Sequence, residues 1–473
     1  MVMPGDSAVP GKEPTSRQLA PTLPATPKLR SPSWGLPEWF VIAQVVGPAL
    51  LILPGAQRIR IAIRVSVFGI SLLGLVLYMY RPRVTRRHPS GTLLATAIGY
   101  LALMILHPAT NTVMAGLAQT GMYLAVAAPI FWAPRYFLGD YRRLARVLTI
   151  LWILNGASAV VGILQVRDPA TWMPAEFSSV VMGDKLGLAK QQYRMDDGRM
   201  AIRPPGLGDC PGAACGAGLF AASVGIAYLG LPVSNARKLL GLALGMAGVS
   251  VIFLSHVRSS LVVLIGSAAV YLTILVIQKR VLTALVLAVS MAACGVIAFQ
   301  YAASLGGKST IDRFATLLED DPLTVYGHSS RLGMIANTFD SLLIDYPLGA
   351  GLGRWGMMRG YFGNENNQNS PGIWVEVQFA AWVIDGGGVL LSLTLIALVV
   401  AVHRLLSLSS RHPSSLLRQW GGVIIMLSAA PVALMFSYTP FNSQIGMQFW
   451  LLIGAFEGVA QGEGRGRSPR NPG

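Results

Sequence analysis

Three arginines lie beside apolar segments of the sequence, in surroundings that suit a phosphorylated ligand. Arg203 precedes two prolines and a glycine, Arg258 follows a short Ser-His-Val sequence, and Arg331 begins a segment with apolar residues at helical spacing. A guanidinium binds phosphate oxygens through paired hydrogen bonds. One arginine alone near a bilayer is better explained as reaching lipid headgroups, but three at one membrane face predict a binding site for a phosphorylated group.

Two carboxylates fall within one long apolar segment, residues 372–402. In a continuous helix, Glu376 would lie near the outer end and Asp385 about 13 Å deeper, on roughly the opposite face. An ionisable side chain inside a membrane is costly and is by default a candidate for function. Glu376 is therefore either a functional carboxylate or an ordinary residue of the membrane interface. Asp385 is a candidate intramembrane polar site.

Glycines recur in a GxGxG pattern at Gly349, Gly351 and Gly353, directly before Arg354. No strand is predicted before them, so a nucleotide-binding fingerprint is not supported. The pattern predicts a tight turn or a close backbone approach, and a phosphate-binding nest of backbone amides is the alternative. The candidate substrate-binding residues are Arg203, His328, Gly349, Gly351 and Arg354.

The sequence predicts neither a metal-binding site nor a disulfide scaffold. The six histidines are scattered without the spacing of metal ligands, so no metal and no cofactor are expected. The three cysteines are an odd number without framework spacing, which argues against a disulfide scaffold.

The composition is that of a membrane protein. Of 473 residues, 53% are hydrophobic and 12% charged, and the mean hydropathy is +0.54. So few charges cannot cover a water-soluble surface, which excludes an ordinary cytoplasmic enzyme and a disordered chain. The net charge of +16 is better explained by basic cytoplasmic loops than by nucleic-acid binding.

The sequence predicts an all-α polytopic membrane protein with about twelve transmembrane helices, because a span needs about 20 apolar residues. The predicted spans are 38–55, 60–80, 91–108, 112–133, 144–165, 211–230, 238–255, 258–278, 280–301, 372–402, 418–438 and 443–460. Nine spans fall within 38–301 and three within 372–460. The Pro-rich segment 1–37 and the segment 461–473 are expected to be disordered cytoplasmic tails.

Basic residues cluster in alternate connections, and this predicts that both termini are cytoplasmic. The connection with Arg58 and Arg60 is the one exception. Two long loops, 166–210 and 302–371, are then extracytoplasmic and hold 13 of the 21 acidic residues. In the larger loop, apolar residues from Leu332 to Tyr346 recur on one helical face, and Pro347 is expected to end that helix.

With these residues in view, the chain resembles the O-antigen ligase and polymerase superfamily of bacterial membrane glycosyltransferases. The layout of twelve spans with a large outer loop between the ninth and tenth is similar. Arg203-Pro204-Pro205-Gly206 looks like the family's Arg-x-x-Gly segment, and Ser255-His256-Val257-Arg258 resembles its Ser-Arg segment. The most specific match begins at Ser330-Arg331-Leu332 and runs to Asp345-Tyr346-Pro347-Leu348-Gly349-Ala350-Gly351-Leu352-Gly353. It is similar to the family's pattern of Arg, helix and then Pro-x-x-Gly-x-Gly.

The resemblance implies a reaction at the outer face of the bacterial cytoplasmic membrane, in surface polysaccharide biosynthesis such as that of lipopolysaccharide or exopolysaccharide. A glycan leaves undecaprenyl diphosphate and is transferred to a hydroxyl of a glycan, lipid or protein acceptor, without metal or cofactor. Arg203, Arg258 and Arg331 would stabilise the leaving diphosphate, and Glu376 would act as base or orienting acceptor. Membrane lipid is the only other expected partner, and nucleic acid is not expected.

One departure from the family pattern concerns the base. The family has a His-Asn pair about ten residues before a Glu-x-Gly, and aligning that Glu-x-Gly with Asp385-Gly386-Gly387 puts Glu376 where the histidine would be. Either Glu376 replaces the histidine, or His328 serves, or the activity differs. The alternative function is a transporter or flippase for a lipid-linked or anionic substrate, which Asp385 favours. The sequence distinguishes neither ligase from polymerase nor one sugar from another.

Overall fold

The computed structural model describes residues 34–80, 85–177, 191–195, 198–319 and 330–466. Of the predicted tails, residues 1–33 and 467–473 lie outside these residues, whereas 461–466 are described and are helical. His328 lies outside the described residues as well. The described residues are helical apart from turns, connecting segments and one short hairpin, in which β1 (Gln192–Arg194) pairs antiparallel with β2 (Met200–Ile202). The all-α class predicted from the sequence is thus confirmed.

Eight helices in the described residues are long and apolar enough to cross a membrane. A helix of 20 residues is about 30 Å long, which matches the hydrocarbon core of a bilayer. They are α2 (Arg60–Met79), α4 (Val113–Ala127) continued by α5 (Pro129–Tyr136), α6 (Tyr141–Arg167), α11 (Asn235–Leu254), α12 (Arg258–Ile277), α13 (Val281–Gly306), α19 (Gln378–Arg411) and α20 (Ser415–Leu434). The chain is therefore a multi-pass membrane protein.

Four more helices overlap predicted spans. Three of them, α1 (Leu36–Leu50), α3 (Pro89–Met104) and α10 (Ala214–Gly230), are apolar but only 15, 16 and 17 residues long. The fourth, α21 (Gln444–Gly466), ends the described chain. All twelve predicted segments thus overlap helices, while eight helices meet the length and hydropathy expected of a span.

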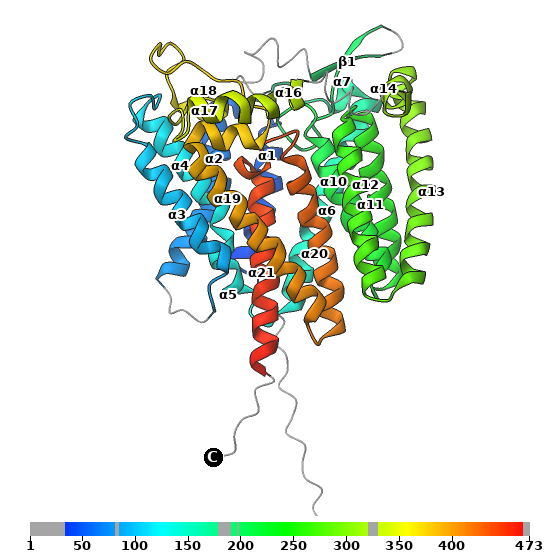
Figure 1. Ribbon diagram of the computed structural model, residues 1–473. Helices are drawn as coiled ribbons and strands as arrows, with labels where there is room; N and C mark the ends of the chain where they lie inside the picture. Colours follow the sequence, from blue (N-terminus) through cyan, green and yellow to red (C-terminus); the bar gives the residue numbers. More distant parts are fainter. Residues whose placement is uncertain (1–33, 81–84, 178–190, 196–197, 320–329, 467–473) are drawn as a thin grey trace, which may run out of the picture. The chain divides into compact units, whose positions relative to one another are not determined.

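The short elements gather at one end of the helical bundle, which we call the loop-bearing end (Figure 1). They are β1, α7 (Pro169–Trp172), α14 (Lys308–Glu319), α16 (Ser330–Asn337) and α18 (Gly356–Phe362). All of them belong to the two long loops, 166–210 and 302–371, that the sequence analysis distinguished. The two loops therefore share one side of the molecule.

The amphipathic helix predicted before Pro347 is present. It begins as α16, continues through a π-helical turn at Thr338–Leu342 and ends in α17 (Leu343–Asp345). Within the π turn, the hydroxyl of Thr338 donates to the carbonyl of Met334 over 2.7 Å. π turns inside helices are rare and are frequent at functional sites.

Glycines let α10 and α11 approach closely. A Cβ atom at Gly225 would lie 2.5 Å from the carbonyl oxygen of Gly241, and one at Gly218 would lie 2.6 Å from that of Gly248. Small residues at such a contact let helix backbones pack tightly within a membrane. The pair therefore fixes the relative positions of the segment before α10 and the turn after α11, which carry two of the candidate arginines.

Helix α19 departs from the expectation for residues 372–402 in two ways. It begins at Gln378, so Glu376 precedes the helix, and the distance and facing predicted for a continuous helix do not hold. It is also broken at Gly386 and Gly387, where φ is −160° and +59°. The segment after Pro347 docks into this break: the amide of Ala350 donates to the carbonyl of Ile384 over 2.7 Å. The break thus replaces a helical hydrogen bond with one to the loop.

Candidate functional site

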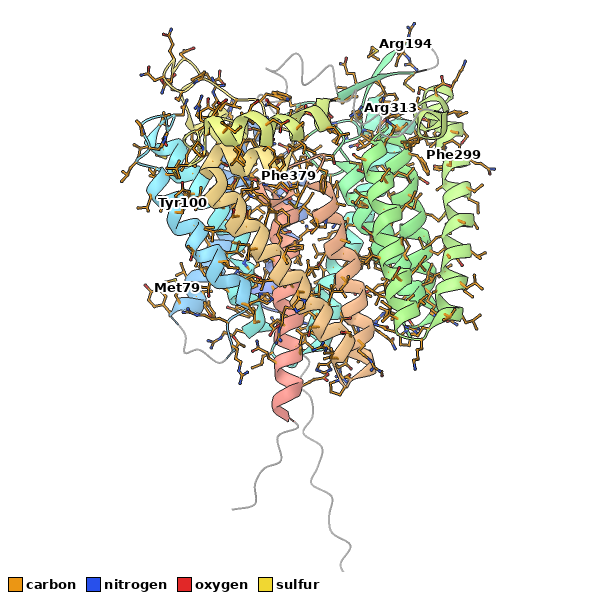
Figure 2. All side chains as sticks on the ribbon, viewed as in Figure 1. Met79, Tyr100, Arg194, Phe299, Arg313 and Phe379 are labelled. Carbon is orange, nitrogen blue, oxygen red and sulfur yellow. The ribbon has the colours of Figure 1, made fainter. Side chains whose placement is uncertain are left out.

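Four arginines from four elements meet at the loop-bearing end, and we call them the arginine cluster: Arg203, Arg258, Arg313 and Arg331. Arg203 follows β2, Arg258 is the first residue of α12, Arg313 lies on α14 and Arg331 on α16. Figure 2 places Arg313 at this end, below Arg194 of the hairpin, with Met79 near the opposite end. The three arginines predicted from the sequence are therefore brought together, and the structure adds a fourth.

Arg203 is held by main-chain hydrogen bonds on both sides. Its amide donates to the carbonyl of Gln191 over 2.9 Å, and its carbonyl accepts from the amide of Gly212 over 3.1 Å. Further along, the side chain of Gln165 on α6 accepts from the amide of Gly206 over 2.7 Å and donates to its carbonyl over 2.9 Å. Gly206 has a φ of +61°, which explains the need for glycine after the two prolines. The Arg-Pro-Pro-Gly segment is thus fixed to the bundle.

Arg258 and Arg313 are joined through α14 and the turn between α11 and α12. The guanidinium of Arg258 donates to the hydroxyl of Thr316 over 2.6 Å, and that of Arg313 donates to the carbonyl of His256 over 3.5 Å. Helix α14 therefore lies against the turn that begins α12. The two hydrogen bonds thus join α14, which belongs to the large loop, to Arg258 and His256 at the end of the transmembrane bundle.

Positive charges act on two members of the arginine cluster. The pKa of Arg313 is lowered to about 10, first by partial desolvation and then by the positive charges of Arg258, Arg203 and Arg331 in that order. Burial also lowers the pKa of Arg203, and the charge of Arg331 adds to this. A positive charge that lowers the pKa of an arginine lies close enough to repel it. The cluster therefore favours an anion between its members.

Glu376 forms an ion pair with one member of the arginine cluster, Arg331. Its carboxylate lies 3.6 Å from Nε of Arg331, with the two side chains 18% and 37% exposed. The indole of Trp374 donates to the same carboxylate over 3.1 Å. Among the described residues, no ion pair joins a carboxylate to Arg203, Arg258 or Arg313. Within the part of the chain that the structure describes, one carboxylate therefore pairs with one of the four guanidinium groups, and positive charge is in excess.

Asp385 lies away from the cluster contacts, in a separate buried network. Its carboxylate accepts hydrogen bonds from Gln119 over 2.9 Å, Tyr123 over 2.7 Å and Trp355 over 2.9 Å. The side chain is fully buried, and the three donors come from α4 and from the segment before α18. The observed contacts are those of a structural link between two transmembrane helices and the large loop.

The GxGxG segment is a close backbone approach, one of the two arrangements expected from its glycines. A Cβ atom at Gly351 would lie 2.5 Å from the backbone of Ala109, and one at Gly349 would lie 2.9 Å from Gly386. The amide of Gly349 already donates to the carbonyl of Tyr346 over 3.0 Å. The amides of Gly349, Ala350 and Leu352 are bound within the protein, so these three are not free to form the alternative phosphate nest.

Arg354 is buried and holds the large loop together. Its guanidinium donates to the carbonyls of Ala350 over 2.8 Å and Pro371 over 3.1 Å. Its own carbonyl accepts from the amide of Ile373 over 2.9 Å. These contacts tie the glycine segment to the chain that leads to Glu376. They give Arg354 a structural role that its sequence position did not reveal.

Arg60, one of the two basic residues that contradicted the charge rule, is explained by pairing. Arg60 is buried at the start of α2, where it donates to the carbonyl of Phe177 over 3.0 Å and lies 3.7 Å from the carboxylate of Asp209. Arg64, one turn further, also hydrogen-bonds Asp209. Arg60 and Arg64 therefore bind the first long loop, 166–210, to α2.

No family model and no curated protein matches this chain. The interpretation of the site thus depends on its own residues.

Arg313 and His256 are the site residues that sequence reasoning missed. A signal for Arg313 existed, because Ile311, Phe314 and Leu317 recur every third residue and predict the helix that carries it. No sequence signal could place His256 against Arg313, since the two are far apart in the chain and meet only through tertiary packing.

Proposed function

We propose that this chain is a glycosyltransferase of the O-antigen ligase and polymerase type in the bacterial cytoplasmic membrane. It transfers a glycan from undecaprenyl diphosphate to an acceptor hydroxyl at the outer face, in surface polysaccharide biosynthesis. The arginine cluster carries the proposal. An excess of guanidinium groups at one end of an apolar bundle suits a diphosphate attached to a long hydrocarbon tail.

The proposed topology has twelve membrane crossings, made by the eight long apolar helices together with α1, α3, α10 and α21. Both termini are cytoplasmic, and the loop-bearing end faces outward. This orientation keeps the arginine cluster on the side where lipid-linked glycans are presented. The basic connections at the opposite ends of the helices agree with the positive-inside rule.

In the proposed reaction the acceptor oxygen attacks the anomeric carbon of the donor. A new glycosidic bond forms as the bond to the diphosphate breaks, and undecaprenyl diphosphate leaves with the bonding electron pair. Glu376 takes the proton of the acceptor hydroxyl, while the arginines stabilise the negative charge on the leaving group. No metal or cofactor is required.

The chain around Glu376 is held at both ends, which supports a positioned base. Ile373 is bound to the carbonyl of Arg354, and the amide of Gln378 donates to the carbonyl of Met435 over 3.0 Å. Between these anchors the segment is not helical. The Glu376 side chain remains partly exposed, so an acceptor hydroxyl has access to it. The ion pair with Arg331 also places the carboxylate beside the arginine cluster.

The test follows release of undecaprenyl diphosphate by mass spectrometry. The purified protein is placed in lipid discs with undecaprenyl-diphosphate glycans and an acceptor. We expect Glu376→Gln and Arg258→Ala each to lower the rate at least 100-fold, within the usual effect of losing a base or an electrostatic stabiliser. Glu365→Gln and Arg194→Ala are matched controls, because both residues are exposed at the same end of the molecule, and they should retain activity.

The outcomes separate the candidates. If Glu376→Gln still releases undecaprenyl diphosphate and the release depends on an acceptor, the protein is a glycosyltransferase but Glu376 is not its base. His328 would then be the next residue to test. If wild type releases nothing, the transporter or flippase is favoured. The observation that supports that alternative is the break in α19 beside the buried carboxylate of Asp385, since broken helices and intramembrane carboxylates mark many transport sites.

A further inference from the structure

His256 occupies an unusual position in the turn between α11 and α12. Its φ is +55°, a left-handed conformation that histidine adopts more readily than most residues with a side chain. Its amide donates to the carbonyl of Phe253 over 3.0 Å, which closes the end of α11. The residue is 2% exposed. A strained backbone kept at a buried site requires support from the surrounding structure.

That support comes from β1 and α14. Strand β1 pairs with β2, which Arg203 follows, and α14 carries Arg313. The imidazole stacks on the ring of Tyr193 in β1, with 4.1 Å between centroids and 25° between planes. Its Nε2 lies 3.5 Å from the hydroxyl of Thr310 on α14. The carbonyl of His256 also accepts from the guanidinium of Arg313 on the same helix. The side chain and main chain together thus join the hairpin and α14 to the turn.

These contacts set the relative positions of three members of the arginine cluster. Tyr193 pairs with Ala201 across the hairpin, two residues before Arg203. Arg313 is bound directly, and Arg258 follows His256 by two residues as the first residue of α12. A shift of His256 would therefore move all three guanidinium groups relative to one another.

The imidazole suits this role because it stays neutral. Burial lowers the pKa of His256 to about 4, and the charges of Arg203 and Arg313 contribute in the same direction. The groups in contact with the ring, the phenol of Tyr193 and the hydroxyl of Thr310, are uncharged at neutral pH. The ring therefore adds contact area without adding to the repulsion in the cluster.

We propose that His256 is a positioning residue that holds Arg203, Arg258 and Arg313 at the spacing needed to bind a diphosphate. This inference rests on the proposed function of the cluster. It assigns to the α11–α12 turn a role in affinity for the lipid diphosphate. His256 itself takes no proton and does not touch the reacting atoms.

The first experiment measures binding of undecaprenyl diphosphate to the purified protein in lipid discs. His256→Asn keeps a residue that tolerates positive φ and keeps the main-chain carbonyl, but it loses the stacked ring. We expect binding to weaken about tenfold. His107→Asn is the matched control, because its ring accepts a hydrogen bond from the local amide of Ala109, and it should bind as wild type does. Unchanged binding by His256→Asn would overturn the inference.

Variants of Tyr193 test the stack without touching the turn. Tyr193→Phe retains the aromatic ring and should bind as wild type does, whereas Tyr193→Leu should weaken binding as His256→Asn does. Equal losses in both Tyr193 variants would contradict a role for stacking. This pair keeps the inference testable even if His256 variants fold poorly.

A double-mutant cycle separates positioning from general damage. If His256 acts through Arg313, the variant with both His256→Asn and Arg313→Ala should bind only about as weakly as the worse single variant. Independent effects would multiply, and that result would overturn the inference. If wild type itself does not bind undecaprenyl diphosphate, the proposed function fails instead, so the two failures are distinguishable.

Discussion

The two acidic residues of the tenth predicted span have different surroundings despite their similar chemistry. Glu376 is partly exposed and forms an ion pair with Arg331. Asp385 is fully buried among three neutral donors and has no cation among its hydrogen-bond partners. Burial of a carboxylate is tolerated when its oxygens accept several hydrogen bonds. At the residue scale, the environment therefore gives Glu376 the candidate chemical role and Asp385 the structural one.

Removing the Asp385 carboxylate should destabilise the fold. We expect Asp385→Ala to lower the free energy of unfolding by about 2–4 kcal/mol, because buried donors on Gln119, Tyr123 and Trp355 lose their acceptor. Asp385→Asn should cost less, since it keeps one acceptor oxygen. The measurement is denaturant unfolding in detergent, with the exposed Asp345→Ala as control. Normal stability combined with lost activity would instead place Asp385 in the chemistry or in transport.

At the scale of elements, the break in α19 and the glycine segment of the large loop depend on each other. The loop fills the break, where the amide of Gly388 donates to the carbonyl of Pro347 over 2.9 Å. No side chain fits between them: a Cβ atom at Gly387 would lie 2.1 Å from the Pro347 carbonyl oxygen. The helix and the loop thus form one unit, and Arg354 extends it towards Glu376.

Adjacent glycines offer a sharp test of this unit. Gly387→Ala should lower the thermal midpoint strongly and reduce the yield of folded protein, because it combines a φ of +59° with a backbone clash. Gly388→Ala should be nearly neutral, because its nearest neighbour to a new Cβ atom is at an ordinary 3.5 Å. The comparison uses thermal unfolding of both purified variants. Equal stability would show that α19 does not need the break.

For the whole molecule, the distribution of charge and of short elements agrees with one outward-facing end. The hairpin, α14, α16 and α18 gather there (Figure 1), and Arg313 of the arginine cluster lies at the same end (Figure 2). The opposite helix ends carry the basic connections, including Arg404, which pairs with Glu457 over 3.0 Å. Basic residues at cytoplasmic helix ends are the general pattern in membrane proteins.

Labelling tests the orientation directly. After replacement of the three cysteines by serine, one cysteine is introduced at Glu365 in the large loop or at Arg411 at the end of α19. An impermeant maleimide should label Glu365→Cys in intact cells, because that residue is exposed at the outward end in the proposed topology. Arg411→Cys should react only after the membrane is opened. The reverse pattern would contradict the proposed orientation and, with it, the outer-face reaction.

The class of protein and most of its helices follow from the amino-acid sequence. Composition excludes a soluble enzyme, and apolar segments of span length fix where helices form, because a lipid-exposed backbone must satisfy its hydrogen bonds within the segment. Local chemistry also identified Arg203, Arg258 and Arg331, and the glycine pattern correctly indicated a close backbone approach at Gly351.

Which residues lie together in one site depends on tertiary packing. Arg313 and His256 join the arginine cluster through contacts between segments far apart in the chain. The start of α19 after Glu376 and its break at Gly387 depend on a loop that docks against the helix, which periodicity within one segment cannot reveal. The sequence sets local preference, but three-dimensional packing sets distance, burial and the partners of each charge.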